Sequence, residues 1–367
     1  MQLRRRYRQP TDHNLMTDTN HFELTCPSPQ PHGETIQLAY GGGGRLMHQL
    51  IEQVFRPAFG NIDNSPLHDS VVLDMTSTRI AMTTDSYVVD PLFFPGGDIG
   101  SMSVHGTVND LAMSGAYPLY ISAGFILEEG LPMETLKRVV HSMQQAAEQA
   151  GVRVVTGDTK VVDQGTCDGL FINTTGIGSL KHDLRIDPSQ VHPGDIIILS
   201  NDIGRHGTAI MAQREGLAFE TTIESDSTPL NHLVQALLEA GYAPHCLRDL
   251  TRGGLATALV EIAQTAEVEI LIERTAVPVR DEVQGACELL GLDPLYVANE
   301  GCCVVILPES EAGPCLDLMR ARSESSDATI IGTVTQAKPV GGVILRSEIG
   351  ALRVVDMLSG EQLPRIC

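Results

Sequence analysis

The chain has 367 residues, of which 42% are hydrophobic and 19% charged, a composition that excludes a disordered chain and indicates two or three globular domains. Its 25 Lys and Arg residues against 46 Asp and Glu residues leave a net charge of −21, which repels phosphate backbones and argues against a nucleic-acid partner. No apolar run approaches the roughly 18 residues that a membrane span requires, so we expect a soluble, cytoplasmic protein without a membrane partner.

The first half of the chain is expected to form an α/β domain. Residues 1–35 are polar and rich in proline without any period, which predicts a poorly ordered extension. Hydrophobic periodicity then indicates an ordered domain over residues 36–185. Its expected elements are a helix over 45–55, strands over 71–73 and 80–82, helices over 103–113 and 132–150, and a strand over 152–155 that breaks at residues 156–160.

A polar, proline-bearing segment over residues 182–194 predicts a domain boundary, and a second domain is expected over residues 190–345. Strands alternate with helices of about ten residues or more in both halves, which predicts two α/β layered domains. Beyond residue 345 the pattern thins, so residues 346–367 are expected to be a flexible tail. The expected elements of the second domain are strands over 196–199 and 268–272 and helices over 204–214, over 230–240 and from residue 254.

The cysteines do not indicate a disulfide scaffold, because eight in this length are too few and no pair has the CxxC spacing of a structural zinc site. Cys302 and Cys303 run into an apolar segment, which favours buried strand thiols. Cys367 differs because it is the last residue of the chain. A thiol on a short terminal arm has reach and little to bury it, and the nearby Arg365 favours the thiolate. Position alone leaves a functional thiol and an accident of composition both open.

Acidic residues follow predicted strands or stand beside glycine at several places. Carboxylates delivered from different segments can hold Mg²⁺ against a polyphosphate, and each ion takes one or two of them. Taken singly, each aspartate is more often a turn former or a helix cap. Asp110 differs because it lies with Asn109 in an apolar segment, where a carboxylate requires a cation or a hydrogen-bond partner. The candidate residues are Asp69, Asp85, Asp110, Asp158 and Asp249.

Glycine, lysine and glutamate supply further candidates. Residues 42–44, which are Gly42, Gly43 and Gly44, precede a predicted helix, where backbone N–H groups can approach a phosphate, although a glycine run is about as often a flexible turn. The chain contains no GxxxxGK[ST] sequence, which excludes a P-loop ATPase. Lys160 is predicted in a glycine-containing loop, either as a phosphate-neutralising or basic group or as an exposed lysine. Glu300 stands just before an apolar strand.

Longer stretches of the chain resemble the HypE family of hydrogenase maturation factors, which belongs to the PurM-like ATP-binding superfamily. The resemblance runs from about residue 36 to the end, and its most specific part is the terminal Pro-Arg-Ile-Cys, because other PurM-like enzymes lack it. The chain departs from the family where Tyr40 replaces a common histidine and glycine replaces serine in the loop that follows. The matching segments are 84–87, 90–97, 124–132, 156–162, 251–254, 299–301 and 364–367.

The resemblance implies a fold and a reaction. The fold is a PurM-like pair of α/β domains, with the N-terminal domains pairing across strands in a homodimer. A HypF-type carbamoyltransferase loads a carbamoyl group onto the sulfur of Cys367, and this protein dehydrates it with ATP to an S-cyanide, giving ADP and phosphate. The cyanide then passes to iron on a HypC–HypD complex during nickel–iron hydrogenase assembly.

The same resemblance implies roles for individual residues. Cys367 carries the substrate, and Lys160 and Glu300 flank the carbamoyl nitrogen and remove its protons. Magnesium ions on the ATP phosphates are expected at Asp69, Asp85, Asp110 and Asp249. The nucleotide itself is expected to contact Gly42, Gly43, Gly44, Asp85, Asn109, Asp110, Asp158 and Asp249.

Two alternative functions are consistent with parts of the sequence. A PurM-like enzyme of the selenophosphate synthetase type, acting on a free small molecule, has no need of a terminal thiol, so Cys367 argues against it. A non-catalytic carrier would shuttle the carbamoyl or cyano group beside a vestigial ATP site. The set of aspartates and Lys160 argue against the carrier, and ATP turnover that depends on a carbamoylated tail would exclude it.

Overall fold

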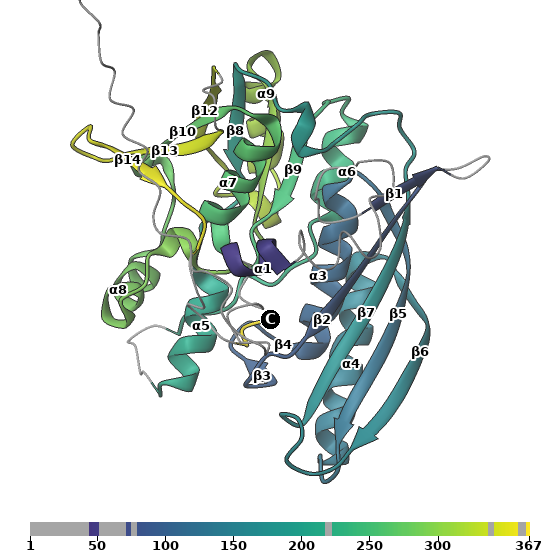
Figure 1. The fold of residues 1–367 in the computed structure, drawn as a ribbon. Helices are drawn as coiled ribbons and strands as arrows, with labels where there is room; N and C mark the ends of the chain where they lie inside the picture. The colour runs from purple at the N-terminus through teal and green to yellow at the C-terminus, as the bar shows by residue number, and fades with distance from the viewer. Residues whose placement is uncertain (1–43, 51–70, 75–78, 217–221, 337–340, 359–364) are drawn as a thin grey trace, which may run out of the picture.

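The structure is a computed structural model, which describes residues 44–50, 71–74, 79–216, 222–336, 341–358 and 365–367. The expected extension over residues 1–35 and three candidate site residues, Gly42, Gly43 and Asp69, lie outside this part of the chain. The described residues form two β-sheets with helices packed against them (Figure 1). No helix among them is long and apolar enough to cross a membrane.

The first half of the chain builds a five-stranded sheet. Its strands are β1 (Val71–Asp74), β2 (Arg79–Tyr87), β5 (Tyr117–Glu128), β6 (Arg153–Val162) and β7 (Leu170–Ser179), in the spatial order β1-β2-β7-β5-β6. Only β5 and β6 pair in parallel, and the helix α4 (Met133–Ala150) makes the crossover that a parallel pair requires. A two-stranded ribbon, β3 (Phe93–Phe94) with β4 (Gly97–Asp98), precedes α3 (Ile99–Met113).

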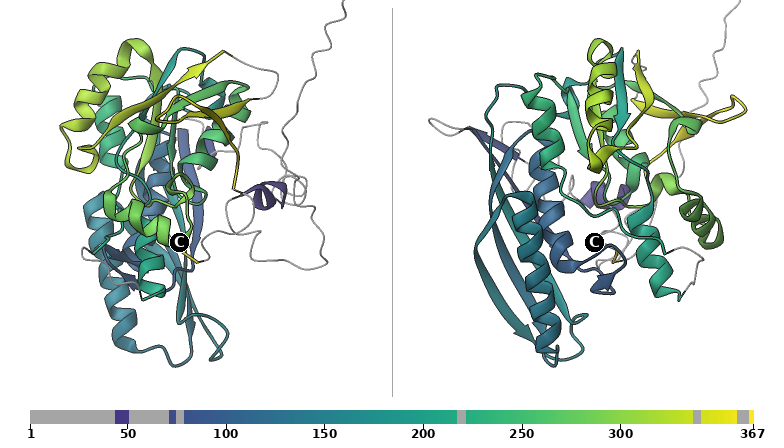
Figure 2. Two further views of the ribbon diagram at one scale, coloured as in Figure 1. Left: turned by 90° about the vertical axis from the view of Figure 1, so that its left-hand side faces the viewer. Right: turned by 180° about the vertical axis from the view of Figure 1, so that it is seen from behind.

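Helices α3 and α4 cover one face of this sheet, and Figure 2 shows both helices between the sheet and the second half of the chain. Asp98 starts α3 because its carboxylate accepts N–H groups from Gly100 and Ser101, while Ser101 returns a bond to the Asp98 backbone. Gly151 ends α4 in the left-handed conformation with φ 71°. The structure thus confirms the helices expected over 103–113 and 132–150, the first starting four residues earlier.

The strands of this half are longer than expected. Strand β2 continues through Asp85, and β6 continues through residues 156–160, so the loop expected at 156–160 is wrong. Gly157 therefore lies inside a strand and not in a turn. Close pairing of β6 with β5 requires glycine there, because a Cβ would lie 2.1 Å from the carbonyl oxygen of Ala123 on β5. Asp158 and Lys160 are therefore residues of an edge strand.

The second half builds a seven-stranded sheet. Its strands are β8 (Asp195–Leu199), β9 (Cys246–Asp249), β10 (Glu269–Glu273), β11 (Cys303–Pro308), β12 (Thr329–Thr335), β13 (Gly342–Arg346) and β14 (Leu352–Val355). The spatial order is β14-β13-β10-β12-β8-β11-β9, and only β10 and β13 pair in parallel. The helices are α5 (Arg205–Arg214), α6 (Asn231–Glu239), α7 (Gly254–Ala266), α8 (Asp281–Leu290) and α9 (Glu309–Arg320). The strands and helices expected in this half are confirmed.

Short elements complete the described chain. A six-residue helix, α1 (Arg45–Leu50), precedes the first sheet, within the region where a helix was expected over 45–55. Single turns of 3-10 helix occur at Pro188–Gln190, Arg274–Ala276, Pro294–Tyr296 and Ser323–Ser325. The segment expected to be a domain boundary, 182–194, connects β7 of the first sheet to β8 of the second.

The segment after residue 345 is more ordered than expected. Strand β14 pairs antiparallel with β13, and the turn between them is closed by backbone bonds between Ser347 and Ala351 and between Gly350 and Ser347. The expectation of a flexible tail over 346–367 is therefore wrong for this hairpin. The hydrophobic alternation expected of a strand is weak here, because Val355 is the one buried residue of β14, while Leu352 and Val354 are exposed.

Helix α3 connects the two halves through its packing. It is buried on all sides, as expected for a helix with core on every face, and it contacts the first sheet together with α6 and β9 of the second half. At its C-terminal end Ala112 and Met113 join a core cluster with Ile198 of β8 and Leu247 of β9. The two halves thus share a continuous apolar core.

Two glycines inside helices allow a matched test of this packing. A Cβ on Gly100 of α3 would lie 2.2 Å from the carbonyl oxygen of Val139 on α4, whereas a Cβ on Gly285 of α8 would meet nothing within 4 Å. We expect Gly100→Ala to lower the free energy of unfolding by about 1–3 kcal/mol through overpacking. Gly285→Ala should raise it by about 0.5–1 kcal/mol, because alanine loses less backbone entropy in a helix. Urea denaturation measures both, and equal effects would contradict the close packing of α3 on α4.

Candidate active site at the docked C-terminus

The last three residues of the chain are docked in the interior, beside the segment that follows β2 (Figure 1). The N–H of Val88 donates to a main-chain oxygen of the last residue, Cys367, at 3.0 Å, and the N–H of Asp90 donates to the carbonyl of Arg365 at 3.2 Å. The two segments run in opposite directions, and Arg365 stands in a turn with φ 51°, so the contact is not a regular strand pairing. The backbone therefore sets how far the terminal residue extends into the protein.

Side chains of the tail are bound as well. Ile366 is 4% exposed and packs in the same apolar cluster as Tyr87 and Ile99. The guanidinium of Arg365 pairs with Asp90 at 3.3 Å and also with Asp168. The expectation that little buries Cys367 is therefore wrong, because the neighbouring isoleucine anchors the tail and leaves the cysteine half-buried.

The thiol of Cys367 lies in a field of three charged groups. Its pKa is raised to about 12, chiefly by burial, with Arg252 lowering it and Glu300 and Asp85 adding to the rise. The docked thiol is consequently protonated at neutral pH and is no nucleophile. Arg365, expected from its position to favour the thiolate, is instead paired with Asp90 and Asp168, and the guanidinium that acts on the thiol belongs to Arg252.

Arg252 belongs to the matching segment 251–254, but it is a site residue that the sequence patterns did not reveal. It lies between β9 and α7, and its Nη2 is 3.8 Å from the Asp85 carboxylate across the seam between the two halves. Its pKa is raised, chiefly by Cys367 and then by Asp85 and Glu300. The available sequence signal was its position between Asp249 and the glycine pair 253–254.

Glu300 is a buried carboxyl group held by its backbone. The N–H groups of Glu300 and Gly301 donate to the Asp226 carboxylate at 3.2 and 3.0 Å, which fixes the loop before β11. Burial raises the pKa of Glu300 well above its ordinary value, and the charges of Asp85, Asp249 and Asp226 add to that shift. A carboxyl group with a raised pKa is suited to exchanging protons near neutral pH.

Asn109 and Asp110 of α3 have protein partners. The Asn109 amide donates to the carbonyls of Thr228 and Glu300 at 3.1 and 3.3 Å, and its oxygen accepts the N–H of Leu230 at 2.7 Å. Asn109 thereby bonds α3 to the second half of the chain. The expected hydrogen-bond partner of Asp110 is Thr83, whose hydroxyl donates to the carboxylate at 2.7 Å.

Lys160 and Asp158 lie apart from this cluster. They form an ion pair at 3.1 Å on the edge strand β6, and each side chain is 71% exposed. The register of the sheet places Gly157 of β6 three strands from Asp85, which is about 14 Å at the usual spacing between strands. Within one chain, the structure does not bring Lys160 beside Glu300 and Cys367.

The remaining candidate, Gly44, lies at the start of α1 against Leu358. The N–H of Arg45 donates to the Leu358 carbonyl at 3.1 Å, and a Cβ on Gly44 would lie 2.2 Å from the same oxygen. Close backbone approach therefore requires glycine at this position.

The carboxylates suit a magnesium ion that is shared with a nucleotide. Among the described residues, no group of three or more His, Cys, Asp or Glu side chains could hold a metal by itself. Magnesium commonly takes one or two carboxylates and completes its shell with phosphate oxygens and water. Asp85 and Asp249 both raise the pKa of Glu300 by repulsion, so a divalent cation here would offset an existing excess of negative charge.

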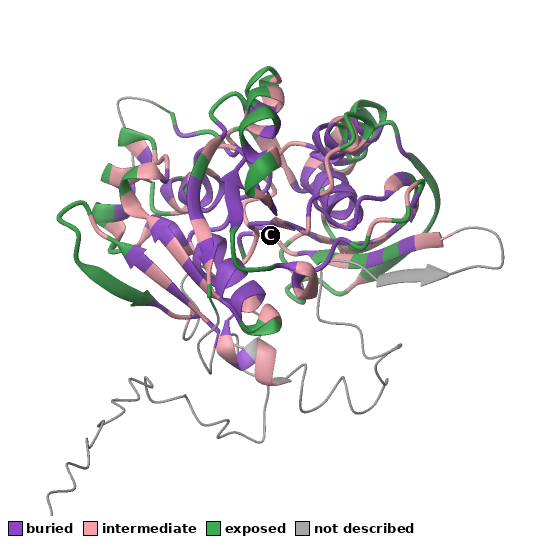
Figure 3. Cartoon of the chain, turned by 90° about the horizontal axis from the view of Figure 1, so that it is seen from above, coloured by how far each residue is buried: buried purple, intermediate pink, exposed green. Residues whose placement is uncertain are grey.

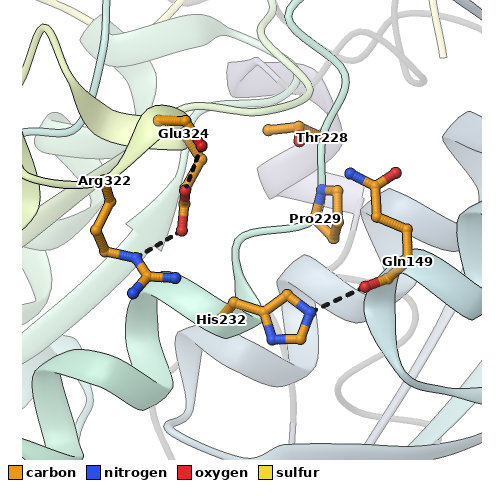
Figure 4. Close-up of a pocket in the computed structure, with 7 residues that line it drawn as sticks. Gln149, Thr228, Pro229, His232, Arg322 and Glu324 are labelled. Carbon is orange, nitrogen blue, oxygen red and sulfur yellow. Dashed lines mark hydrogen bonds and ion pairs between the residues drawn. The ribbon is translucent and has the colours of Figure 1, made fainter.

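A separate pocket of about 360 Å³ lies between the end of α4, the start of α6 and the 3-10 turn at Ser323–Ser325 (Figure 4). Gln149, Thr228, His232, Arg322 and Glu324 are among its lining residues. None of the candidate site residues lines it, so it is not the site defined by the docked tail.

Two family models and a curated relative match most of the chain. The model of "AIR synthase related protein, N-terminal domain" matches residues 67–180, and that of the corresponding C-terminal domain matches residues 192–344. The carbamoyl dehydratase HypE of Rhodobacter capsulatus is 51% identical over 337 residues, which cover 91% of this chain and 98% of the relative.

Two solved structures are similar over most of the chain. A crystal structure of a HypE–HypF complex matches with a TM-score of 0.79 and 46% identity, over 84% of this chain and 99% of that chain. A crystal structure of HypE in complex with ATP matches with a TM-score of 0.76 and 50% identity, over 91% of this chain and 100% of that chain.

The class follows from the two domain matches and the fold: this is a two-domain PurM-like protein of the AIR synthase-related type. Within that class, the chain belongs to the HypE family of hydrogenase maturation factors, whose curated members are named carbamoyl dehydratases. The fold class and the family expected from the sequence are thereby confirmed.

The buried Glu300 makes a prediction about pH. Because its pKa is raised in the folded protein, the folded state binds this proton more tightly than the unfolded chain does, and that stabilisation is lost as the pH rises through the raised pKa. Without nucleotide and Mg²⁺, Glu300→Gln should therefore be more stable than the parent by on the order of 1–2 kcal/mol at pH 8, with the two converging near about pH 4.

Urea denaturation across this pH range measures the difference. Glu348→Gln, at an exposed glutamate in the β13–β14 turn, is the matched control and should follow the parent at every pH. A Glu300→Gln difference that does not change with pH would contradict the raised pKa.

Proposed function

We propose that the chain is an ATP-dependent carbamoyl dehydratase that acts on its own C-terminal cysteine. The observation that carries the proposal is the docked Cys367 between Arg252, Asp85 and Glu300, in a chain half identical to carbamoyl dehydratases. The docked thiol itself is protonated and unreactive. The site therefore suits chemistry on a group that the sulfur carries, not chemistry by the sulfur.

The reaction converts a carbamoyl thioester into a thiocyanate. The carbamoyl oxygen attacks the γ-phosphorus of ATP, which forms a new O–P bond and releases ADP. The C–O bond then breaks and the oxygen leaves in phosphate, while the nitrogen loses both protons and the C–N bond becomes triple. One carbamoyl group and one ATP thus give one S-cyanide, one ADP and one phosphate, which retains the oxygen and accounts for both protons. Phosphorylation is required because an amide oxygen alone is a poor leaving group.

Different described residues act at different steps of this reaction. Glu300, a carboxyl group with a raised pKa beside the thiol, accepts a proton from the carbamoyl nitrogen. Arg252 neutralises negative charge that builds up on the transferred oxygen. Asp85, Asp110 and Asp249 are the described residues that would hold Mg²⁺, which supplies charge neutralisation for the nucleotide phosphates. Asn109 and Asp158 stay predictions as nucleotide contacts, as do Gly42, Gly43 and Gly44, and Asp69 as a further ligand.

Lys160 requires a second copy of the chain in this proposal. Strand β6 is exposed along almost its whole length (Figure 3), and the uncovered face and edge of the sheet expose Met82, Val155, Val161 and Ile177. We infer a homodimer in which these sheets pack together, because an apolar sheet face of this kind is a typical interface. Lys160, too far from Glu300 in its own chain, then acts on the tail of the partner.

Two protein partners complete the proposed function. A thiol with a pKa of about 12 is not carbamoylated in place, so the tail leaves its docking position to be loaded. A HypF-type carbamoyltransferase is the proposed source of the carbamoyl group, supported by the similarity to a HypE–HypF complex. A HypC–HypD complex is the proposed acceptor of the cyanide for a nickel–iron hydrogenase.

Mass spectrometry of the C-terminal peptide tests the reaction. The full chain is loaded by its carbamoyltransferase with carbamoyl phosphate and ATP, and sampled before and after fresh Mg-ATP. We expect Cys367 to gain one carbamoyl group and then to lose one water in an ATP-dependent step. Loading without loss of water would instead support a non-catalytic carrier. An unmodified tail, with a carbamoyltransferase that is active on a known acceptor, would overturn the assignment and favour an enzyme of a free small molecule.

Mixed dimers test the role of Lys160. Lys160→Ala alone should lower the dehydration rate about a hundredfold or more, because a proton-transfer group is lost. Mixing it with Cys367→Ser chains should restore dehydration of the Lys160→Ala tails, since each such tail meets an intact Lys160 of its partner. Lys137→Ala, at an exposed lysine of α4, is the matched control and should keep the parent rate. No restoration after proven subunit exchange would show that Lys160 does not act across subunits.

A further inference from the structure

The middle carbonyl of the docked tail is bound by a histidine of the second half of the chain. The Nε2 of His206, on α5, lies 2.6 Å from the carbonyl oxygen of Ile366, and the imidazole is fully buried. The main-chain oxygens on either side, those of Arg365 and Cys367, accept bonds from the segment after β2 in the first half, and that of Arg365 also accepts a bond from Arg214 of α5. His206, together with Arg214 of the same helix, therefore relates the position of the tail to the second half, which carries Arg252 and Glu300, and of the two it is His206 that bonds the residue next to Cys367.

The hydrogen-bond pattern assigns the proton on His206. A carbonyl only accepts, so Nε2 carries the hydrogen and donates it to Ile366. Nδ1 of a neutral ring is then an acceptor, and its partner is the Ser225 hydroxyl at 2.8 Å. Ser225 in turn accepts the N–H of Ser227 at 3.1 Å, which leaves the hydroxyl proton for His206. Burial lowers the pKa of His206, while Asp226 and the Ile366 carbonyl raise it, and the ring is neutral at pH 7.

Helix α5 is itself bonded to the segment that carries Glu300. The N–H of Gly207 donates to the carbonyl of Ala298 at 3.1 Å. The N–H of Gly204 donates to the side-chain oxygen of Asn299 at 2.7 Å. His206 lies between these two attachment points, so its imidazole holds a fixed position relative to Glu300. The ring of Phe94 packs perpendicular to the imidazole, with the ring centres 5.5 Å apart.

We propose that His206 is a positioning residue, which fixes the carbonyl of Ile366 and thereby sets the carbamoyl group of Cys367 against Glu300 and Arg252. Ser225 supports it by holding the tautomer in which Nε2 is the donor. The docking role concerns the structure alone, whereas its effect on dehydration rests on the proposed function. A reacting group displaced by about an ångström loses much of its rate, so one hydrogen bond next to the reacting residue has a large effect.

Alkylation of Cys367 measures docking independently of catalysis. The full-length protein without nucleotide is treated with iodoacetamide, and the C-terminal peptide is quantified by mass spectrometry over time. We expect His206→Phe to raise the alkylation rate of Cys367 about tenfold, because the Ile366 carbonyl loses its donor. His206→Gln should return most of the protection, since its amide N–H can take the place of Nε2–H. A rate for His206→Phe equal to that of the parent would overturn the proposal, as would a His206→Gln rate as high as that of His206→Phe.

A matched control is available in His232. Its Nε2 also bonds a backbone carbonyl between the two halves, that of Gln149 at 2.9 Å, but it lines the separate pocket of Figure 4 and does not touch the tail. His232→Phe should alkylate at the parent rate. Alkylation at Cys367 in this variant as fast as in His206→Phe would show general loosening between the halves and overturn the specific role of His206.

Alkylation of the buried Cys303 and Cys315 would reveal that His206→Phe does not fold. A second variant tests the proposal in that case. Ser225→Ala removes the partner of Nδ1, together with the acceptor of the Ser227 N–H, but leaves the imidazole in place, and we expect a rise of about threefold in the Cys367 rate. An unchanged rate would overturn the proposal. Single-turnover dehydration of loaded tails separates the two hypotheses. If the alkylation rates follow the expectation but the parent dehydrates no tail, docking by His206 stands and the proposed function fails.

Discussion

The candidate active site depends on the binding of the C-terminal residues 365–367 where the two halves of the chain meet. Backbone N–H groups of Val88 and Asp90 bind two main-chain oxygens of the tail from one side, and His206 binds the carbonyl between them from the other. Because these bonds are made to the main chain, they fix the extension of the tail, and burial of Ile366 supplies the apolar anchor. The terminal cysteine is thereby placed among charged groups that neither half could assemble alone.

The charges around the docked Cys367 suit chemistry on a group that is bound to its sulfur. Burial and two carboxylates raise the pKa of Cys367 to about 12, so docking suppresses the reactivity of a free thiol. Burial, together with the charges of Asp85, Asp249 and Asp226, raises the pKa of Glu300 and makes it a better proton acceptor. Arg252 offsets part of the negative charge. Carbamoylation of the sulfur and dehydration of the bound carbamoyl group thus require different environments. Release of the tail provides the first environment, and docking provides the second.

Packing around α3 gives the seam its rigidity. This helix is buried on all sides, and Asn109 uses both its amide and its oxygen to bond backbone groups of the second half. Buried polar groups with complete partners specify one arrangement, because any slip would leave them unsatisfied. The loop that carries Glu300 is fixed in the same way by Asp226, so the reacting groups are presented on rigid supports.

Local patterns in the sequence determined the α/β class, helix α4, the buried strands of the second half and the family, because periodicity and motifs depend on neighbouring residues. They did not show that β6 continues through Gly157 or that β14 forms, since both depend on pairing with a distant strand. The roles of Cys367, Asp85 and Glu300 were proposed from the family resemblance. Only the tertiary structure showed that Arg252 lies with them and that burial of Ile366 anchors the tail. It also showed that Lys160 lies several strands away from Asp85 in the first sheet. The physical reason is that proximity across a sheet or a seam is set by long-range register and packing, which no local pattern contains.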